Sequence, residues 1–170
     1  DKFTPESVHD NFVMMYGADD TGDITNNKNI KYYAREVDSG TNGRGLALLL
    51  ADGGVASTDT EWNKQEVSMY QLLLCQCITA LTVLRKGGSF TCKIFDVFTP
   101  FTVGLVYIMY LFFERISIIK PFTCRPASSE RYLSCLNLRV RRPEKMLKYL
   151  RQVNKRLTRK ENVTEIVSVE

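Results

Sequence analysis

The sequence predicts an α/β fold, with a mostly parallel β-sheet that is covered by helices and ends in an antiparallel hairpin. Apolar, β-prone runs alternate along the chain with longer segments in which apolar residues recur at helical spacing. This alternation is typical of a parallel sheet with helices on both faces. The last two predicted strands, 116–120 and 131–140, are joined by only ten residues. Because a helical crossover needs about a dozen or more, we expect these two strands to be antiparallel.

The first half of the chain is expected to contain three helices and one strand. Residues 4–16 are predicted to form a helix, because a polar residue followed by proline is typical of a helix start. An acidic, turn-rich loop over 17–25 separates it from a second helix over 26–38. The continuous apolar run over 46–51 predicts a strand that is buried on both faces. Residues 59–85 predict a long helix, because apolar residues recur there every three or four positions.

The second half is expected to alternate between strands and helices. A pair of glycines precedes a β-prone segment over 89–95, and the apolar segment 100–115 follows as a helix. A final amphipathic helix is predicted from Pro143 onward, with an apolar stripe on one side and many basic residues on the other. The longest apolar run, 101–113, is shorter than the roughly 20 residues of a membrane span. A membrane is therefore not an expected partner.

The composition argues against several classes of site. With 170 residues, 44% of them hydrophobic, the chain is long enough for one packed domain or for part of a larger one. The single histidine, His9, lies near the start, so Ser-His-Asp hydrolysis and histidine-ligated zinc are not expected. The five cysteines include no CxxC motif, which favours reduced structural thiols over disulfides or a metal site.

The most informative residue is Lys93, a lone lysine in the apolar, β-prone run 90–100. An ammonium group inside such a strand is costly unless a partner compensates for its burial. Asp52 directly follows the first predicted strand, and Glu130 directly precedes the last one. Because open α/β sheets place ligand sites at the ends of their strands, we expect the amine and the two carboxylates to form a reaction centre.

The predicted topology is that of S-adenosylmethionine-dependent methyltransferases, which have a Rossmann-like sheet with an antiparallel terminal hairpin. Several segments extend the resemblance over about residues 20–138. They are Gly22-Asp23-Ile24-Thr25, Ala51-Asp52-Gly53-Gly54, Gln71-Leu-Leu-Leu-Cys-Gln76, Gly88-Ser-Phe-Thr-Cys-Lys93 with the residues up to Tyr107, and Lys120-Pro-Phe-Thr-Cys-Arg125-Pro-Ala-Ser-Ser-Glu130-Arg-Tyr132. In this order and spacing they resemble the eukaryotic cap-specific mRNA (nucleoside-2′-O-)-methyltransferases, which belong to the FtsJ-like family.

The resemblance implies methyl transfer from S-adenosyl-L-methionine to a ribose 2′-hydroxyl of RNA, at the cap-proximal nucleotide of mRNA. The family is known for a Lys-Asp-Lys-Glu tetrad, and Asp52, Lys93 and Glu130 match its last three members. The first lysine and the family's glycine-rich cofactor loop have no match. Residues 1–140 are therefore expected to be the C-terminal two-thirds of the domain, truncated on the N-terminal side. Residues 141–170 are expected to be a basic amphipathic helix and tail of that domain, and this fragment alone is expected to be inactive.

The resemblance also implies contacts outside the tetrad. The cofactor is expected to contact three residues: Asp23, Ile24 and Asp52. RNA is expected to contact three others: Asn63, Ser128 and Arg125. Ordinary structural roles are the alternatives, such as an Asx-type helix cap for Asp23 or a surface salt bridge for Arg125. The basic side of the final helix either adds phosphate contacts or is a solvated helix face.

Two questions stay open at this point. Lys93 suits either a neutral amine that takes up the proton of the hydroxyl or an ammonium group that orients the lone pair of the hydroxyl. A non-catalytic RNA-binding or scaffold domain, or an enzyme for ribosomal or transfer RNA, fits the same residues.

The expected partners are the capped 5′ end of mRNA and the missing N-terminal part of the domain. No bound metal is expected. The expected location is the nucleus, with the cytoplasm as the alternative.

Overall fold

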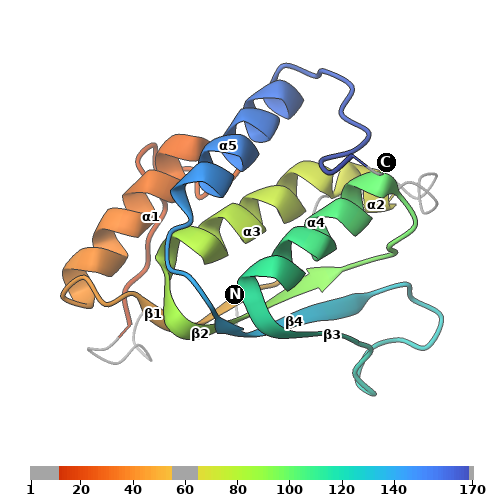
Figure 1. The fold of residues 1–170 in the computed structure, drawn as a ribbon, viewed down its shortest axis with the longest axis horizontal. Helices are drawn as coiled ribbons and strands as arrows, with labels where there is room; N and C mark the ends of the chain where they lie inside the picture. Colours follow the sequence, from red (N-terminus) through yellow and green to blue (C-terminus); the bar gives the residue numbers. More distant parts are fainter. Residues whose placement is uncertain (1–11, 55–64, 169–170) are drawn as a thin grey trace.

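The computed structural model describes residues 12–54 and 65–168, which form a four-stranded β-sheet and a layer of helices (Figure 1). In chain order the elements are α1 (Asn27–Gly40), β1 (Leu46–Ala51), α2 (Gln65–Ser68), α3 (Tyr70–Val83), β2 (Leu84–Ile94), α4 (Pro100–Phe112), β3 (Phe113–Ile119), β4 (Arg131–Leu138) and α5 (Glu144–Thr158). None of the helices in the described ranges is long and apolar enough to cross a bilayer.

The strands lie in the order β1-β2-β4-β3. β1 and β2 run parallel, with Leu50 opposite Thr91, whereas β4 runs antiparallel to both β2 and β3. The predicted combination of parallel strands and an antiparallel terminal hairpin is therefore confirmed. Because β4 lies between β2 and β3, the chain passes through α4 to the edge of the sheet and then returns to pair with β2. This path places the start of β4 beside the end of β2.

The helices cover one face of the sheet. Figure 1 shows α1, α3, α4 and α5 together on the same side of the strands. Along β2, Phe90 and Cys92 are fully buried and face this layer, whereas Thr91 between them and Lys93 after them face the other way. On the outer face of β1, Leu48 is 53% and Leu50 is 68% exposed. The prediction of helices on both faces is wrong for the described residues, because an apolar strand does not by itself show which of its faces is covered.

The start of the chain also differs from the prediction. Residues 12–16, predicted as the end of a helix, are not helical, and residues 1–11 lie outside the described residues. The main-chain oxygen of Tyr16 accepts a hydrogen bond from the amide of Gly22 at 2.6 Å. This bond closes the loop that follows, so the oxygen is not available to continue a helix.

Two strands begin earlier than predicted. β2 starts at Leu84, which pairs with the first residue of β1. The helix predicted to reach residue 115 ends at Phe112, because Phe113 is fully buried and pairs with Leu138 as the first residue of β3. An apolar run of this kind has no internal signal that separates the end of a helix from the start of a strand.

The core lies between the sheet and α3. Of the helix predicted over 59–85, residues 59–64 lie outside the described residues, and the remainder is observed as the short α2 and as α3, which is buried on nearly every side. The apolar stripe of α5 packs against α3, and its residues Leu147, Leu150 and Val153 are 0–3% exposed. Burial of each such side chain contributes about 1.5–3 kcal/mol to folding. The strands that end near Lys93 are therefore held in place by a well-packed core.

Candidate active site

Three segments that are far apart in the sequence meet at one edge of the sheet. Because β1 and β2 are parallel, their carboxyl ends lie side by side, with Asp52 after the first and Lys93 near the end of the second. β4 begins at Arg131, which pairs with Ile94, the last residue of β2. Glu130, which directly precedes β4, is thereby brought to the same edge.

Lys93 contacts one of the two acids directly. Its Nζ donates to Oδ1 of Asp52 at 2.9 Å and to the main-chain oxygen of Asp52 at 3.3 Å. The side chain of Lys93 is 16% exposed, whereas that of Asp52 is 72% exposed. The stem of the lysine is thus buried along the sheet while its head reaches the surface beside a carboxylate. Since charge-assisted hydrogen bonds are stronger than neutral ones, Asp52 fixes the direction of the amine.

Glu130 is held by other partners. Its Oε1 accepts hydrogen bonds from the hydroxyl of Tyr132 at 3.0 Å and from the thiol of Cys124 at 3.3 Å. Burial, followed by the hydrogen bond to Glu130, raises the pKa of Tyr132 to about 12. Burial and the same carboxylate also raise the pKa of Cys124. Both groups therefore stay protonated at neutral pH and remain donors to Glu130.

The structure thus brings the three predicted residues to one edge of the sheet, but only one of the two acids contacts the amine. In the described part of the chain, Lys93 forms an ion pair with Asp52 and not with Glu130. The sequence interpretation missed Tyr132 and Cys124. Tyr132 could have been found, because it stands two residues after Glu130 in an extended segment and so points to the same face. Cys124 lies in the connection between β3 and β4, where no such periodicity applies.

The loop before α1 forms a second part of the site. The buried side chain of Asn29 holds it, since it accepts from the amide of Ala18 and donates to the main-chain oxygen of Asp23, both at 2.8 Å. Both carboxylate oxygens of Asp23 accept hydrogen bonds from Thr25. The cap of α1 is Asn26, whose side chain accepts from an amide of the first turn. Asp23 therefore forms an Asx turn and does not cap the helix.

This loop borders a cavity of about 610 Å³ beside β1, here named the β1 cavity. Asp23, Ile24 and Gly54 line it, and most of its other walls are apolar. Gln76 also lines it, is only 2% exposed, and has a side-chain oxygen without a hydrogen-bond donor in residues 12–54 and 65–168. A Cβ on Gly54 would lie 3.9 Å from Nζ of Lys93. The β1 cavity therefore extends to the immediate neighbourhood of the amine.

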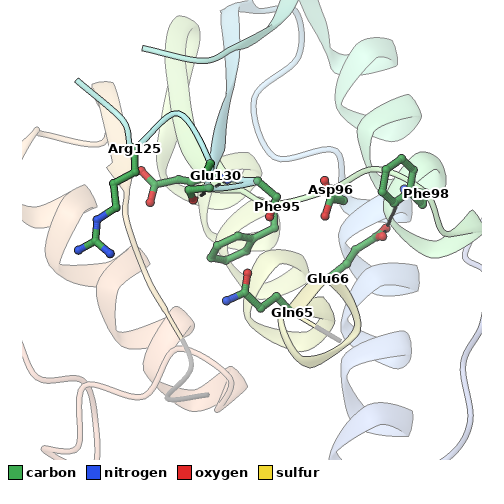
Figure 2. Close-up of a pocket in the computed structure, with 10 residues that line it drawn as sticks. Gln65, Glu66, Phe95, Asp96, Phe98, Arg125 and Glu130 are labelled. Carbon is green, nitrogen blue, oxygen red and sulfur yellow. Dashed lines mark hydrogen bonds between the residues drawn. The ribbon is translucent and has the colours of Figure 1, made fainter. Parts of the chain in front are cut away.

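A cavity of about 720 Å³ lies beside Glu130 and is here named the Glu130 cavity (Figure 2). Two of the predicted RNA contacts, Arg125 and Ser128, line it together with Glu130. The third predicted contact, Asn63, lies outside the described residues. Glu130 also lines a further cavity of about 610 Å³ with Tyr132, over the outer face of the sheet.

The basic side of α5 lies apart from Lys93. The groove between α5 and α1 is lined by five cations: Lys31, Lys145, Lys148, Arg151 and Lys155. Both helices belong to the layer on the covered face (Figure 1), whereas Lys93 follows the buried Cys92 along β2 and faces the open side. Contacts of this groove would therefore be remote from the candidate active site. Within the described ranges, no cluster of His, Cys, Asp and Glu could hold a metal ion.

Comparison with protein families gives a match to the FtsJ-like methyltransferase family over residues 2–138. Among solved structures, a putative ribosomal RNA methyltransferase from Plasmodium falciparum superposes with a TM-score of 0.55 at 18% identity, covering 69% of this chain and 61% of that one. At this level of identity the likeness concerns the fold alone. It agrees with the predicted Rossmann-like methyltransferase sheet.

Curated relatives are 40–50% identical to the chain over the residues that align with it. Cap-specific mRNA (nucleoside-2′-O-)-methyltransferase 1 of Dictyostelium discoideum is 44% identical over 169 residues, which are 99% of this chain and 22% of the relative. The protein of the same name from Danio rerio is 50% identical over 79% of this chain and 16% of the relative. A Caenorhabditis briggsae relative, named as an inactive form 1B, is 40% identical over 95% of this chain and 19% of its own length. The chain thus spans about a fifth of these relatives.

Proposed function

The chain belongs to the FtsJ-like methyltransferase family, and from this premise we propose that the protein that carries it methylates a ribose 2′-hydroxyl at the cap-proximal nucleotide of mRNA. The observation that carries the proposal is the contact of 2.9 Å between Lys93 and Asp52 at the carboxyl ends of two parallel strands. The names of the relatives support the choice of capped mRNA as the substrate.

The β1 cavity fits S-adenosylmethionine as the methyl donor. Its apolar walls suit the flat faces of an adenine ring, and the buried oxygen of Gln76, which has no donor among the described residues, is an acceptor for an amino group. Asp23 and Ile24 would border the adenosine part, and Asp52 would face the charged methionine part. When bound, this cofactor supplies an electrophilic methyl group on its sulfonium.

Lys93 provides the chemistry at the hydroxyl. A neutral amine at Nζ would accept the hydroxyl proton while the new C–O bond forms, whereas an ammonium would donate to the oxygen and direct its free lone pair. In the second case the hydroxyl proton passes to water. Asp52 keeps Nζ in one direction in both cases, because its carboxylate accepts from the amine. Glu130, with its donors Tyr132 and Cys124, borders the cavities on the other side of the amine, where the RNA would enter.

A second candidate function is binding of RNA without methyl transfer. One observation favours it: the Caenorhabditis briggsae relative is named as inactive. The likeness to a ribosomal RNA methyltransferase does not favour ribosomal RNA as the substrate, because it concerns the fold alone.

The test is a methyl-transfer assay with the native full-length protein, S-adenosylmethionine carrying a tritiated methyl group, and short capped RNA. Label is expected in the ribose of the cap-proximal nucleotide, and RNA that already carries a 2′-O-methyl group there is expected to accept none. Label in a base, or label in uncapped ribosomal RNA alone, would contradict the proposal. Binding of capped RNA without transfer would support the second candidate. We also expect the protein in the nucleus, where mRNA is capped, and fluorescence microscopy of the tagged protein tests this.

A further inference from the structure

An aromatic ring lies close to the candidate active site without a role in the chemistry above. Phe95 directly follows β2, so its Cα lies two residues, or about 7 Å, beyond that of Lys93. Figure 2 shows its ring projecting into the Glu130 cavity near the side-chain amide of Gln65. Phe95 is only partly buried, so one part of its surface is open to the cavity. An aromatic face beside an amide is suited to a nucleobase, which stacks on the ring and exchanges hydrogen bonds with the amide.

The charges around the Glu130 cavity leave a cation free for a phosphate. Arg125 is exposed, and its guanidinium makes no hydrogen bond or ion pair within the part of the chain that the structure describes. Two of the acids in the wall are already engaged: Asp96 with Arg131 at 3.5 Å, and Glu66 with main-chain amides. Figure 2 shows Arg125 at one end of the cavity, on the side of Glu130.

The segment that carries the ring is fixed in place. The carboxylate of Glu66 accepts hydrogen bonds from the amide of Phe98 at 3.2 Å, the amide of Thr99 at 3.0 Å and the hydroxyl of Thr99 at 2.6 Å. Glu66 belongs to α2, so it ties the segment after β2 to a different element. A stacking surface held in this way loses little conformational entropy when a base binds.

We propose that the Glu130 cavity binds the nucleotide whose 2′-hydroxyl is methylated, with its base stacked on Phe95 and its phosphate at Arg125. The assignment rests on the proposed function. The short separation between Phe95 and Lys93 favours the base of the reacting nucleotide over that of a more distant one, since a base lies next to the 2′-hydroxyl of its own ribose. Stacking is tolerant of base identity, so this contact positions any of the four nucleotides.

The test compares two capped RNAs in the native full-length protein, one normal and one abasic at the target nucleotide but with its ribose hydroxyl intact. Phe95→Ala is expected to lower kcat/KM on the normal RNA about 5- to 150-fold, which corresponds to the range of base–aromatic stacking. On the abasic RNA the variant and the wild type are expected to be equal. Phe95→Trp keeps a stacking face and is expected to retain activity on the normal RNA. Phe95→Leu keeps apolar volume without a ring and is expected to behave like Phe95→Ala.

A control is Phe122→Ala, since Phe122 is a fully exposed phenylalanine in the loop between β3 and β4 that lines none of the cavities described above. Arg125→Ala is expected to weaken binding of both RNAs and to lower the slope of log affinity against log salt by about one. An equal loss for Phe95→Ala on normal and abasic RNA would overturn this inference but not the proposed function, because the ring would then act on the fold. Failure of the wild type to methylate either RNA would instead overturn the proposed function.

Discussion

The two acids at the edge of the sheet differ in what they hold. Asp52 is 72% exposed and accepts directly from the amine of Lys93, whereas Glu130 is partly buried and accepts from the neutral donors Tyr132 and Cys124. Exposed ion pairs contribute only about 0–1 kcal/mol to folding, so the contact of Asp52 with Lys93 adds little to stability. We infer that Asp52 orients the amine, while Glu130 is itself oriented and faces the cavities.

The largest effect on kcat is expected from substitution of Lys93, whose amine carries out the proposed chemistry. Lys93→Ala should lower kcat about 10²- to 10⁴-fold, the usual range for loss of a positioned acid or base. Cofactor binding, measured by calorimetry, should change little. Lys93→Arg separates the two roles, because arginine keeps its proton and supports turnover only if a cation suffices. Lys86, an exposed lysine of the same strand, provides the matched alanine control; normal turnover by Lys93→Ala would refute the assignment.

The next effect tests the difference between the acids themselves. Asp52→Asn removes the charge that holds Nζ, and a misplaced amine is expected to cost about 10²-fold in kcat. Glu130→Gln should cost less in kcat and more in KM for RNA, because Glu130 borders the cavities and does not contact the amine. Steady-state kinetics with varied RNA measures both constants. The reverse order of the two kcat losses would show that the two acids have exchanged these roles in the working enzyme.

A smaller effect is expected from the donors to Glu130. Tyr132→Phe removes one hydroxyl and should lower kcat/KM about fivefold, which corresponds to about 1 kcal/mol for one hydrogen bond. Because the pKa of Tyr132 is raised to about 12, the hydroxyl stays protonated in ordinary assays. The ratio of wild type to variant should therefore be constant from about pH 6 to 10, well below that pKa. A ratio that changes across this range would show that Tyr132 itself titrates.

The controls for this prediction use chemically similar changes. Cys124→Ser keeps a donor at the second position and should retain more activity than Cys124→Ala. Tyr149→Phe removes a hydroxyl that donates to the main-chain oxygen of Ile166 at 2.7 Å, on the covered side of the sheet. This variant should change stability and leave the methyl-transfer kinetics unchanged. A fivefold kinetic loss in Tyr149→Phe would mean that the Tyr132 effect is not specific to Glu130.

The sequence predicted this edge of the sheet well because the edge depends on apolar patterns within single segments and on the lengths of the connections between them. The apolar run before Asp52 and the apolar, β-prone run around Lys93 predict strands, and the helix between them predicts that they are parallel. The short connection before Glu130 predicts an antiparallel return. These three statements are sufficient to place the three residues at one edge. Strand periodicity also contained the position of Tyr132 relative to Glu130, although the interpretation did not use it.

Other features depend on contacts between distant segments, which a single sequence does not show. Glu66 caps the segment after β2 from a different element, and the hydrogen bond from Cys124 depends on how the loop between β3 and β4 returns. The side of the sheet that the helices cover depends on the path of every connection. The same holds for the side-chain oxygen of Gln76, which lacks a donor within the described ranges although its sequence context is an ordinary buried helix.

The last prediction concerns a third carboxylate, Asp38, which sharpens the comparison because it has two charged partners and no part in the site. Its two oxygens accept from Arg141 and Arg142 at 2.7 Å each. The hydrogen bond from Arg142, with the charges of both guanidinium groups, lowers the pKa of Asp38 against the opposing effect of burial. A lowered folded-state pKa means that this stabilisation is fully present above the ordinary value of about 3.9 and is lost as pH falls below it.

Asp38→Asn should therefore lower the free energy of opening of α1 by about 1 kcal/mol at neutral pH, since half-exposed pairs are partly screened. It should also remove the part of the pH dependence that lies below about pH 4. Amide hydrogen exchange in α1 of the native protein measures both, and Glu36→Gln on the exposed side of α1 is the matched control. Methyl transfer should be unchanged, because Asp38 ties α1 to the segment that follows β4, at the opposite end of that strand from the residue that pairs with Lys93. A kinetic loss as large as that of Asp52→Asn would show that the frame, and not the direct contact with the amine, decides the activity.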